Sequence, residues 1–353
     1  MSITKRVFGT LSDGTTVYRY TMQNKNAMTV SVMEYGAAVT EVIVPDRNGV
    51  FADVAGGFDD PKYYEKDESY MGSIVGRFAN RIKGAVFMLD GVRYHVSANA
   101  GNDLMHGGFR GFTFRMWDIT PRDGEEPALV CRCFSPDGEE GFPGNMQVEV
   151  TYTLCNDNTL SVAYRAVSDK KTVINLTNHS YFNLGGFGAG DIFDHELWVD
   201  ADTYLPLTPA LVPTGEILPV AGTPFDFTTP KTIGRDYVND HPHFAVMGGY
   251  DVTLNFVGGK QKTPVLRAVA YHPASGRELR IFTDQPCVQL YTANDFYAAE
   301  RPMKGGVPQH TQAIFCLETQ GMPDDMDRPD FRSPVIDAGE EFFSVTEFSF
   351  GIR

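Results

Sequence analysis

A regular alternation of apolar and polar residues is the feature that most limits what this chain can fold into. In the segment 146–154, MQVEVTYTL, every second residue from Met146 to Leu154 is apolar or aromatic, and polar residues lie between them. The turn residues CNDNT follow, and the segment 160–166, LSVAYRA, alternates again. A period of two is typical of strands with one buried face, so these two runs predict a β-hairpin.

The same period recurs along most of the chain, whereas helical periodicity is nearly absent. Residues 27–49 predict a strand, a break at glycine, a second strand and a turn. No stretch of about twelve residues carries an apolar stripe with helical spacing free of Gly or Pro. With 35 Gly and 21 Pro between short strands, and no evident linker or repeat, the sequence predicts an all-β fold. We expect a large antiparallel β-sandwich that forms a single domain over residues 1–353.

Charge and cysteine content narrow the classes of partner. A formal net charge of −15 argues against a nucleic-acid partner and against an anionic membrane surface. The N-terminal segment lacks the apolar core of a signal peptide, and no run approaches the roughly 18 apolar residues of a membrane helix. The five cysteines are odd in number and show no CxxC spacing, which favours reduced thiols. We therefore expect a cytoplasmic protein, and the sequence leaves open whether it is a monomer or a homodimer.

Several common catalytic motifs are missing from the sequence. The glycines of 185–190 do not have the GxGxxG spacing, and there is no GxxxxGK, GxSxG or HExxH. The two histidines of 241–243 are expected on an exposed loop. What remains is a set of polar segments expected at strand ends, each beside Gly or an aromatic residue: 76–82, 102–108, 175–184, 249–254, 288–294 and 317–327. Uncharged hydrogen-bonding groups of this kind favour a small ligand that carries many hydroxyl groups, such as a sugar.

The segment 175–184, NLTNHSYFNL, is the most unusual of these. It surrounds His179 with asparagine, threonine and serine, and it adds two aromatic residues, Tyr181 and Phe182. Buried polar groups need hydrogen-bond partners, so this mixture indicates a partly buried polar site. We expect the amides to orient the imidazole and to contact ligand hydroxyls, and the aromatic rings to exclude water.

Two groups are suited to proton transfer. Glu318 follows the apolar run AIFCL and is expected where a buried strand emerges, so that its carboxylate can act as a base. His179 is the complementary acid. His106 precedes two glycines, which leave space beside its ring. When each residue is taken alone, a structural role explains it better: an ion pair at a strand end for Glu318 and a hydrogen-bonded core histidine for His179.

Together, the polar segments resemble those of the aldose 1-epimerase family. Residues 175–184 match the pattern N-x-T-N-H-x-Y-F-N-L without exception. The other segments occur in the family's order, namely GR-x-A-N-R-I, HGG, the histidine motif, YD, VQ-x-YT-x-N and LETQ-x-x-PD. The resemblance runs from the break at 35–36 to the C-terminal strand. It implies a β-supersandwich that interconverts the α and β anomers of free aldoses such as glucose and galactose, with a sugar as its partner and without metal or cofactor.

The resemblance also implies roles for individual residues. Glu318 resembles the general base that takes the proton of the C1 hydroxyl, and His179 resembles the general acid at the ring oxygen. His106 resembles a second histidine that assists at the ring oxygen. The residues that resemble those holding the sugar hydroxyls are Asn80, Arg81, Asp251 and Gln289. Two departures are Met105, in place of leucine, and the acidic segment 322–330, which is expected to alter the rim of the site.

Alternatives from two classes remain open. One is an epimerase of a related sugar or of a hexose 6-phosphate on the same fold, which would require additional Arg or Lys for the phosphate. The other is a carbohydrate-binding protein without catalysis, which would be expected to lack the acid or the base.

Overall fold

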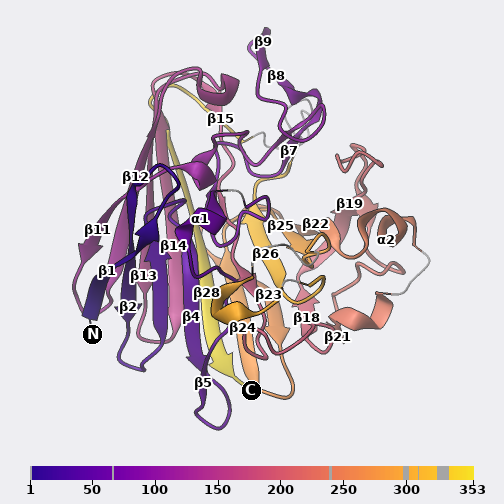
Figure 1. The fold of residues 1–353 in the computed structure, drawn as a ribbon. Coiled ribbons are helices and arrows are strands. Elements are labelled where there is room, and N and C mark those ends of the chain that lie inside the picture. The colour runs from indigo at the N-terminus through magenta and orange to yellow at the C-terminus, as the bar shows by residue number, and fades with distance from the viewer. Residues whose placement is uncertain (1, 66, 238–240, 297–301, 309, 324–333) are drawn as a thin grey trace.

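The structure is a computed structural model that describes residues 2–65, 67–237, 241–296, 302–308, 310–323 and 334–353 (Figure 1). Helix is confined to short segments such as α1 (Pro61–Tyr64) and α2 (Pro242–Met247). Each begins with proline after a capping residue, and Asp60 accepts the Lys62 N–H at 2.9 Å to start α1. Within the described ranges, no helix has the length and apolarity needed to cross a membrane.

Three antiparallel sheets account for most of the strands. The five-stranded sheet contains, in spatial order, β1 (Ser2–Thr10), β2 (Thr16–Gln23), β3 (Thr29–Met33), β4 (Val39–Pro45) and β5 (Phe51–Asp53). The nine-stranded sheet contains β11 (Asp118–Arg122), β12 (Ala128–Ser135), β13 (Met146–Leu154), β14 (Thr159–Ser168), β28 (Glu341–Ile352), β24 (Arg277–Thr283), β23 (Val265–Tyr271), β18 (Glu196–Val199) and β21 (Lys231–Thr232). The six-stranded sheet contains β17 (Tyr181–Phe182), β26 (Phe315–Gln320), β25 (Cys287–Tyr291), β22 (Asp251–Phe256), β19 (Ala201–Leu205) and β20 (Leu218–Pro219).

Four two-stranded ladders complete the described strands. They pair β6 (Ile74–Val75) with β16 (Thr177–Asn178), β7 (Arg81–Ile82) with β10 (Leu104–Met105), β8 (Val86–Leu89) with β9 (Val92–His95), and β15 (Thr172–Val173) with β27 (Val335–Ile336). Three of these ladders join segments more than twenty residues apart. β7 and β10 pair the predicted polar segments 76–82 and 102–108, and β6 and β16 place the segment 175–184 beside residues 74–75.

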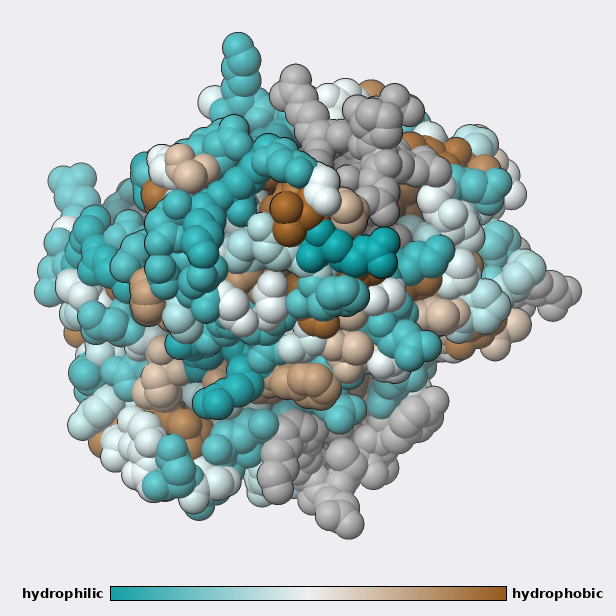
Figure 2. Space-filling view, turned by 90° about the horizontal axis from the view of Figure 1, so that it is seen from above, coloured by the Kyte–Doolittle hydropathy of each residue, from teal (hydrophilic) through white to brown (hydrophobic). Residues whose placement is uncertain are grey.

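One continuous core holds the layers together. The nine-stranded sheet forms the long layer in Figure 1, and the other two sheets lie against it. Each sheet contributes inward-facing side chains to a single cluster, for example Val30 and Val42, Val148 and Val162, and Leu254 and Leu290. The predicted all-β sandwich is confirmed. The outer face seen from above is largely hydrophilic, with its apolar side chains dispersed rather than gathered in one patch (Figure 2).

The predicted hairpin is also confirmed. β13 and β14 pair from Met146 opposite Ser168 to Leu154 opposite Leu160, and the alternating residues of β13 are buried. The predicted strand, glycine break and strand of 27–49 correspond to β3 and β4, separated by Gly36 with φ of +68°. A left-handed φ of this kind costs glycine little and explains why the break falls there.

Arg77 anchors the polar segment 76–82 to the rest of the fold. Its side chain is buried, and Nε donates to Ser135 Oγ at 2.8 Å. The other guanidinium nitrogens donate, at 2.8 to 3.0 Å, to backbone carbonyl oxygens of Ser135, Pro136, Pro143 and Gly144. Burial lowers the pKa of Arg77 to about 10, so the group stays charged at neutral pH. One cation thus joins the end of β12, through Ser135 and Pro136, to the loop residues Pro143 and Gly144 that precede β13.

Replacing Arg77 should therefore destabilise the protein far more than replacing an exposed arginine. Arg77→Met removes the side-chain donor from all four carbonyl oxygens, of which Pro136 O still accepts the Glu139 N–H at 3.1 Å, and we expect the free energy of unfolding to fall by about 3 kcal/mol or more. The control is Arg165→Ala, whose half-exposed ion pair with Glu341 should be worth less than about 1 kcal/mol. Urea denaturation measures both, and equal losses in the two variants would refute the anchoring role.

Candidate active site

Three neighbouring strands of the six-stranded sheet arrange one row of polar side chains. Glu318 of β26 lies directly opposite Gln289 of β25, and Gln289 lies directly opposite Thr253 of β22. Opposed residues project from the same face of a sheet, and so do residues two apart on one strand. Asp251 therefore shares that face. The row lines a cavity of about 890 Å³.

Glu318 lies deep inside this cavity and not at a strand end. β26 continues to Gln320, and Glu318 is only 2% exposed, so the prediction that it emerges from a buried strand is wrong. Burial, with a smaller contribution from the Asp251 carboxylate, raises the pKa of Glu318 well above its usual value. A carboxyl group in this environment takes up a proton far more readily than one in water.

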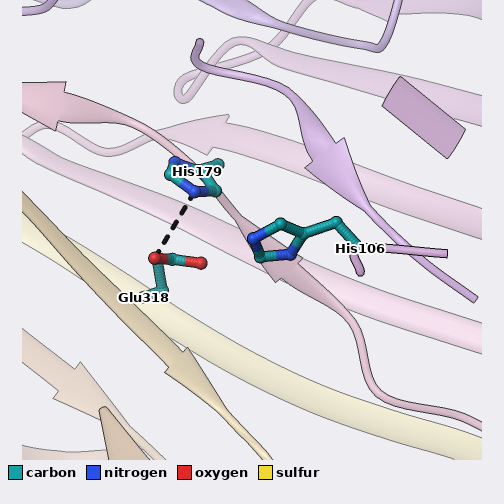
Figure 3. A group of neighbouring side chains, drawn as sticks. All are labelled: His106, His179 and Glu318. Carbon is teal, nitrogen blue, oxygen red and sulfur yellow. Dashed lines mark ion pairs between the residues drawn. The ribbon is translucent and has the colours of Figure 1, made fainter. Parts of the chain in front are cut away.

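His179 faces Glu318 across the cavity. Its Nε2 lies 3.4 Å from Glu318 Oε1, the contact drawn as a dashed line in Figure 3. The backbone N–H of His179 donates to Ser73 O at 2.9 Å, which fixes the residue just beyond β16. The ring centroid lies 6.0 Å from that of Tyr70 and 5.0 Å from that of Tyr181. Burial lowers the pKa of His179 to about 3.

The asparagines around His179 hold the backbone and do not contact its ring, which corrects the expectation from sequence. Asn175 Nδ2 donates to Ala79 O at 3.1 Å and to Gly321 O at 3.2 Å. Asn178 and Asn183 likewise donate to backbone carbonyl oxygens, at 2.9 to 3.1 Å. None of the three lines the cavity. Their role is to satisfy irregular backbone, since this segment runs between short ladders and lacks sheet partners for many of its groups.

The two aromatic residues of the segment point in different directions. Tyr181 lines the cavity, as expected. Phe182 belongs to the core, where its ring centroid lies 5.8 Å from that of Phe348 and 5.9 Å from that of Phe350. Adjacent residues of a strand project to opposite faces, so only one of the two can reach the site. The expectation that both exclude water from the site is right only for Tyr181.

Two hydrogen bonds join His106 and Asn80. The Asn80 N–H donates to His106 Nδ1 at 3.1 Å, and the His106 N–H donates to Asn80 O at 3.0 Å. Both residues have left-handed φ, +49° for His106 and +67° for Asn80, and such strain is often concentrated at functional sites. The two glycines after His106 make room for neighbouring chain: a Cβ on Gly107 would lie 1.9 Å from Gly76 O, and a Cβ on Gly108 would lie 2.2 Å from Glu140 Oε2.

The remaining predicted residues meet at the same cavity. Gln289 Oε1 accepts hydrogen bonds from Thr253 Oγ1 at 2.6 Å and from Asn80 Nδ2 at 3.2 Å, while its Nε2 donates to Asp251 Oδ1. Burial raises the pKa of Asp251, and the Arg81 cation partly opposes that shift. All seven residues singled out from sequence line this one cavity: Asn80, Arg81, His106, His179, Asp251, Gln289 and Glu318.

Sequence reasoning missed several lining residues, including Tyr70, Asn99, Phe114, Thr253, Tyr291 and Phe296. Thr253 and Tyr291 lie two positions after Asp251 and Gln289, so strand alternation would have placed them on the same face. Tyr70 lies in a loop and Phe114 ends the single 3₁₀ turn η2 (Phe112–Phe114), and no periodic signal marks either residue. Most of the acidic segment 322–330, namely residues 324–330, lies outside the described residues.

The histidine pair at 241–243 is closer to the site than expected. His241 precedes α2 and His243 lies within it, and both are partly buried instead of exposed on a loop. His243 Nε2 accepts the backbone N–H of Asp251 at 3.4 Å. The interpretation of these residues as exposed is therefore wrong, and His243 helps to fix the start of β22.

Three of the buried groups are close enough together to be considered as metal ligands. Ligand atoms of His106, His179 and Glu318 all lie within 4.8 Å of one another. However, His106 Nδ1 accepts a backbone N–H, so the neutral ring carries its proton on Nε2 and has no lone pair there for a metal. The geometry favours hydrogen-bond donation into the cavity over coordination of an ion.

Comparison with known proteins gives a consistent result across nearly the whole chain. The family model described as aldose 1-epimerase matches residues 18–349. The galactose mutarotase of Homo sapiens is 41% identical over 353 residues, which cover 99% of each chain. The aldose 1-epimerase of Escherichia coli (strain K12) is 33% identical over 343 residues, which cover 96% of each chain.

Solved structures show the same likeness. The galactose 1-epimerase from Lactobacillus acidophilus NCFM superposes with a TM-score of 0.85 at 27% identity, covering 100% of this chain and 99% of its own. An aldose epimerase homologue from C. elegans superposes with a TM-score of 0.85 at 28% identity, covering 94% of this chain and 98% of its own.

The environment of the two cavity histidines leads to a spectroscopic prediction. Burial lowers the pKa of His179 to about 3 and that of His106 well below 6.5, so both rings should stay neutral between about pH 8 and pH 5. Nitrogen-15 NMR of the imidazole nitrogens, assigned with His106→Gln and His179→Gln, measures this directly. A titration midpoint near 6.5 for either ring would contradict the burial argument.

Proposed function

We propose that this chain, which belongs to the aldose 1-epimerase family, interconverts the α and β anomers of free aldohexoses such as glucose and galactose through Glu318 and His179. Membership of the family makes the protein an isomerase with aldose 1-epimerase activity. The observation that carries the assignment of the two groups is their geometry. A buried carboxyl and a buried imidazole lie 3.4 Å apart in a cavity that also gathers the amide and guanidinium groups of Asn80, Arg81 and Gln289.

The proposed reaction opens and recloses the sugar ring. The Glu318 carboxylate takes the proton of the C1 hydroxyl, the electrons of that O–H bond form the carbonyl, and the bond from C1 to the ring oxygen breaks. The His179 imidazolium gives a proton to the ring oxygen, which keeps the electron pair of the broken bond. Rotation about C1–C2 presents the other face of the aldehyde, and the two groups then act in reverse to close the ring.

The pair holds one exchangeable proton throughout this cycle. The form that starts ring opening is carboxylate with imidazolium, and the form that ends it is carboxylic acid with neutral imidazole. Burial raises the pKa of Glu318 and lowers that of His179, so both shifts favour the neutral form. The environment therefore lowers the energy of the open-chain state relative to the closed-ring state.

The other predicted residues are suited to hold the sugar. Arg81 and the Asn80 amide offer donors to the cavity, and Asp251 offers an acceptor whose position is fixed by the Gln289 amide. His106 presents its Nε2–H to the cavity because its Nδ1 is occupied. Sugars are bound by such convergent donors and acceptors, together with aromatic rings against their apolar faces.

Charge in the cavity disfavours a hexose 6-phosphate as substrate. Among the described residues that line it, Arg81 is the one Lys or Arg side chain. The carboxyl groups that line it are those of Glu65, Asp67, Glu68, Asp251, Asp295 and Glu318. A dianionic phosphate would be repelled by this excess of acidic groups. The non-catalytic alternative is disfavoured by the presence of both proton-transfer groups in one cavity.

We also propose that residues 1–353 act as one domain, because the cavity is built by segments from Glu65 to Glu318 around one continuous core. A cytoplasmic location is proposed as well. It is supported by the five cysteines, none of which forms a disulfide in the described part of the chain.

Polarimetry of freshly dissolved α-D-galactose tests the catalytic assignment. Glu318→Gln removes the base and His179→Asn removes the acid, so each variant should lose at least about 100-fold of the enzymatic rate. Glucose 6-phosphate, at the same concentration, should react much more slowly than galactose with the unchanged protein.

The matched control is His310→Asn, because His310 is exposed and lies outside the cavity. It should keep the full rate. A Glu318→Gln or His179→Asn variant that folds and also keeps the full rate would remove that residue from the mechanism, and an inert wild type would refute the proposed function for free sugars.

The pH dependence follows from the same shifts in pKa. Activity needs one proton on the pair, so it is lost in acid when His179 and Glu318 are both protonated and lost in base when neither is. Because the pKa of His179 is lowered to about 3, the acid limb of kcat/KM should lie well below 6.5. Because the pKa of Glu318 is raised, the alkaline limb should lie well above 4.5. An acid limb at or above 6.5, after subtraction of the spontaneous rate, would contradict the assignment.

A further inference from the structure

A buried thiol lies directly behind the proposed acid. Cys316 precedes Glu318 by two residues on β26, so both side chains project from the same face. Its Sγ lies 3.4 Å from His179 Nδ1, on the opposite side of the ring from the nitrogen that faces Glu318. The thiol is fully buried and does not line the cavity, so it does not reach the sugar.

We propose that Cys316 is a positioning residue whose sulfur accepts the Nδ1–H of His179 and thereby reserves Nε2 for proton exchange with the sugar. The inference rests on the proposed function, and it assigns a role to a residue that neither the sequence motifs nor the proposed reaction uses. Cys316 acts through His179 and not on the substrate.

The positions of the protons on the His179 ring during the reaction explain why an acceptor is needed beside Nδ1. The imidazolium carries a proton on each nitrogen, and after Nε2 has given its proton to the ring oxygen, the neutral ring must keep the proton on Nδ1. Only then is the Nε2 lone pair ready to take the proton back when the ring closes. A thiol sulfur is a weak acceptor, and Cys316 is placed to provide it.

Because the thiol is neutral, it does not raise the pKa of His179. Burial raises the pKa of Cys316 well above its usual value, so the group stays uncharged at neutral pH. A carboxylate in the same place would stabilise the imidazolium and raise the pKa of His179. The thiol orients the ring without that effect, and His179 remains a strong acid once protonated.

His106 provides the contrast within the same cavity. Its Nδ1 faces the backbone N–H of Asn80, which can donate but cannot accept. Its ring is therefore fixed with the proton on Nε2, and giving that proton away would leave an anionic imidazolate. His106 can hydrogen-bond to the sugar but cannot shuttle a proton, whereas His179, with an acceptor behind Nδ1, can.

Two variants of Cys316 and one matched control test the proposal. Cys316→Ala removes the acceptor, and we expect kcat to fall by about 10- to 100-fold while KM changes little. Cys316→Ser restores an acceptor and should recover most of that loss. The control is Cys287→Ala on the neighbouring strand β25, because Cys287 is equally buried and its Sγ contacts Gln320 O at 3.2 Å, away from His179. This variant should keep kcat unchanged.

A second readout does not depend on activity. In the wild type, nitrogen-15 NMR should show His179 as the neutral tautomer with its proton on Nδ1, and in Cys316→Ala this tautomer should lose its predominance. His106 should keep its proton on Nε2 in both proteins. If the wild type shows no mutarotation but these tautomers are observed, the proposed function fails while the role of Cys316 in positioning His179 stands.

Two results would overturn the proposal. One is a Cys316→Ala variant with unchanged kcat and unchanged His179 tautomer. The other is a loss of kcat that Cys316→Ser does not restore and that Cys287→Ala reproduces, because that pattern would indicate a general packing effect.

Discussion

The burial of Glu318 against His179 is the constraint on which the rest of the site depends. Taking a carboxylate out of water is costly unless it is paired or protonated. Here the cost is limited because the imidazole lies 3.4 Å away and the two groups can share one proton. The sheet must therefore hold both buried groups at a fixed separation. The surrounding polar network satisfies the buried Gln289 and Asp251 side chains, whereas Glu318 Oε2 has no hydrogen-bond partner among the described residues.

Strand register fixes the position of Glu318 relative to the other polar side chains of the cavity. Glu318, Gln289 and Thr253 are opposed across three adjacent strands, and their spacing is set by backbone hydrogen bonds instead of by flexible loops. A shift of one residue in β26 would turn Glu318 away from the cavity. His179 comes from irregular chain, so it needs other support. The asparagine amides of 175–184 provide it by bonding to backbone groups.

Much of this was predictable from sequence, and the failures have physical causes. Period-two alternation predicted the β13–β14 hairpin, because one face of each strand is buried along its whole length. The seven residues predicted to form the site do line one cavity. The burial of Glu318 in the interior of β26 was not predicted. An apolar run followed by a polar residue looks the same whether the strand ends or crosses a polar cavity. Cys316 was missed because its role depends on which atom it faces, which a linear pattern does not encode.

Among the described residues that line the cavity, Arg81 is the one lysine or arginine. This scarcity of cations affects the pKa of Glu318. A lysine beside the carboxylate would lower its pKa and stabilise the charged pair, which is the partner of the closed ring. Burial acts in the opposite direction, because it raises the pKa of Glu318 and lowers that of His179. A neutral thiol behind Nδ1 leaves the lowered pKa of His179 in place, whereas an anionic group there would raise it. Both shifts favour the neutral pair, which accompanies the open chain, and they make the carboxylate a stronger base and the imidazolium a stronger acid when these forms occur.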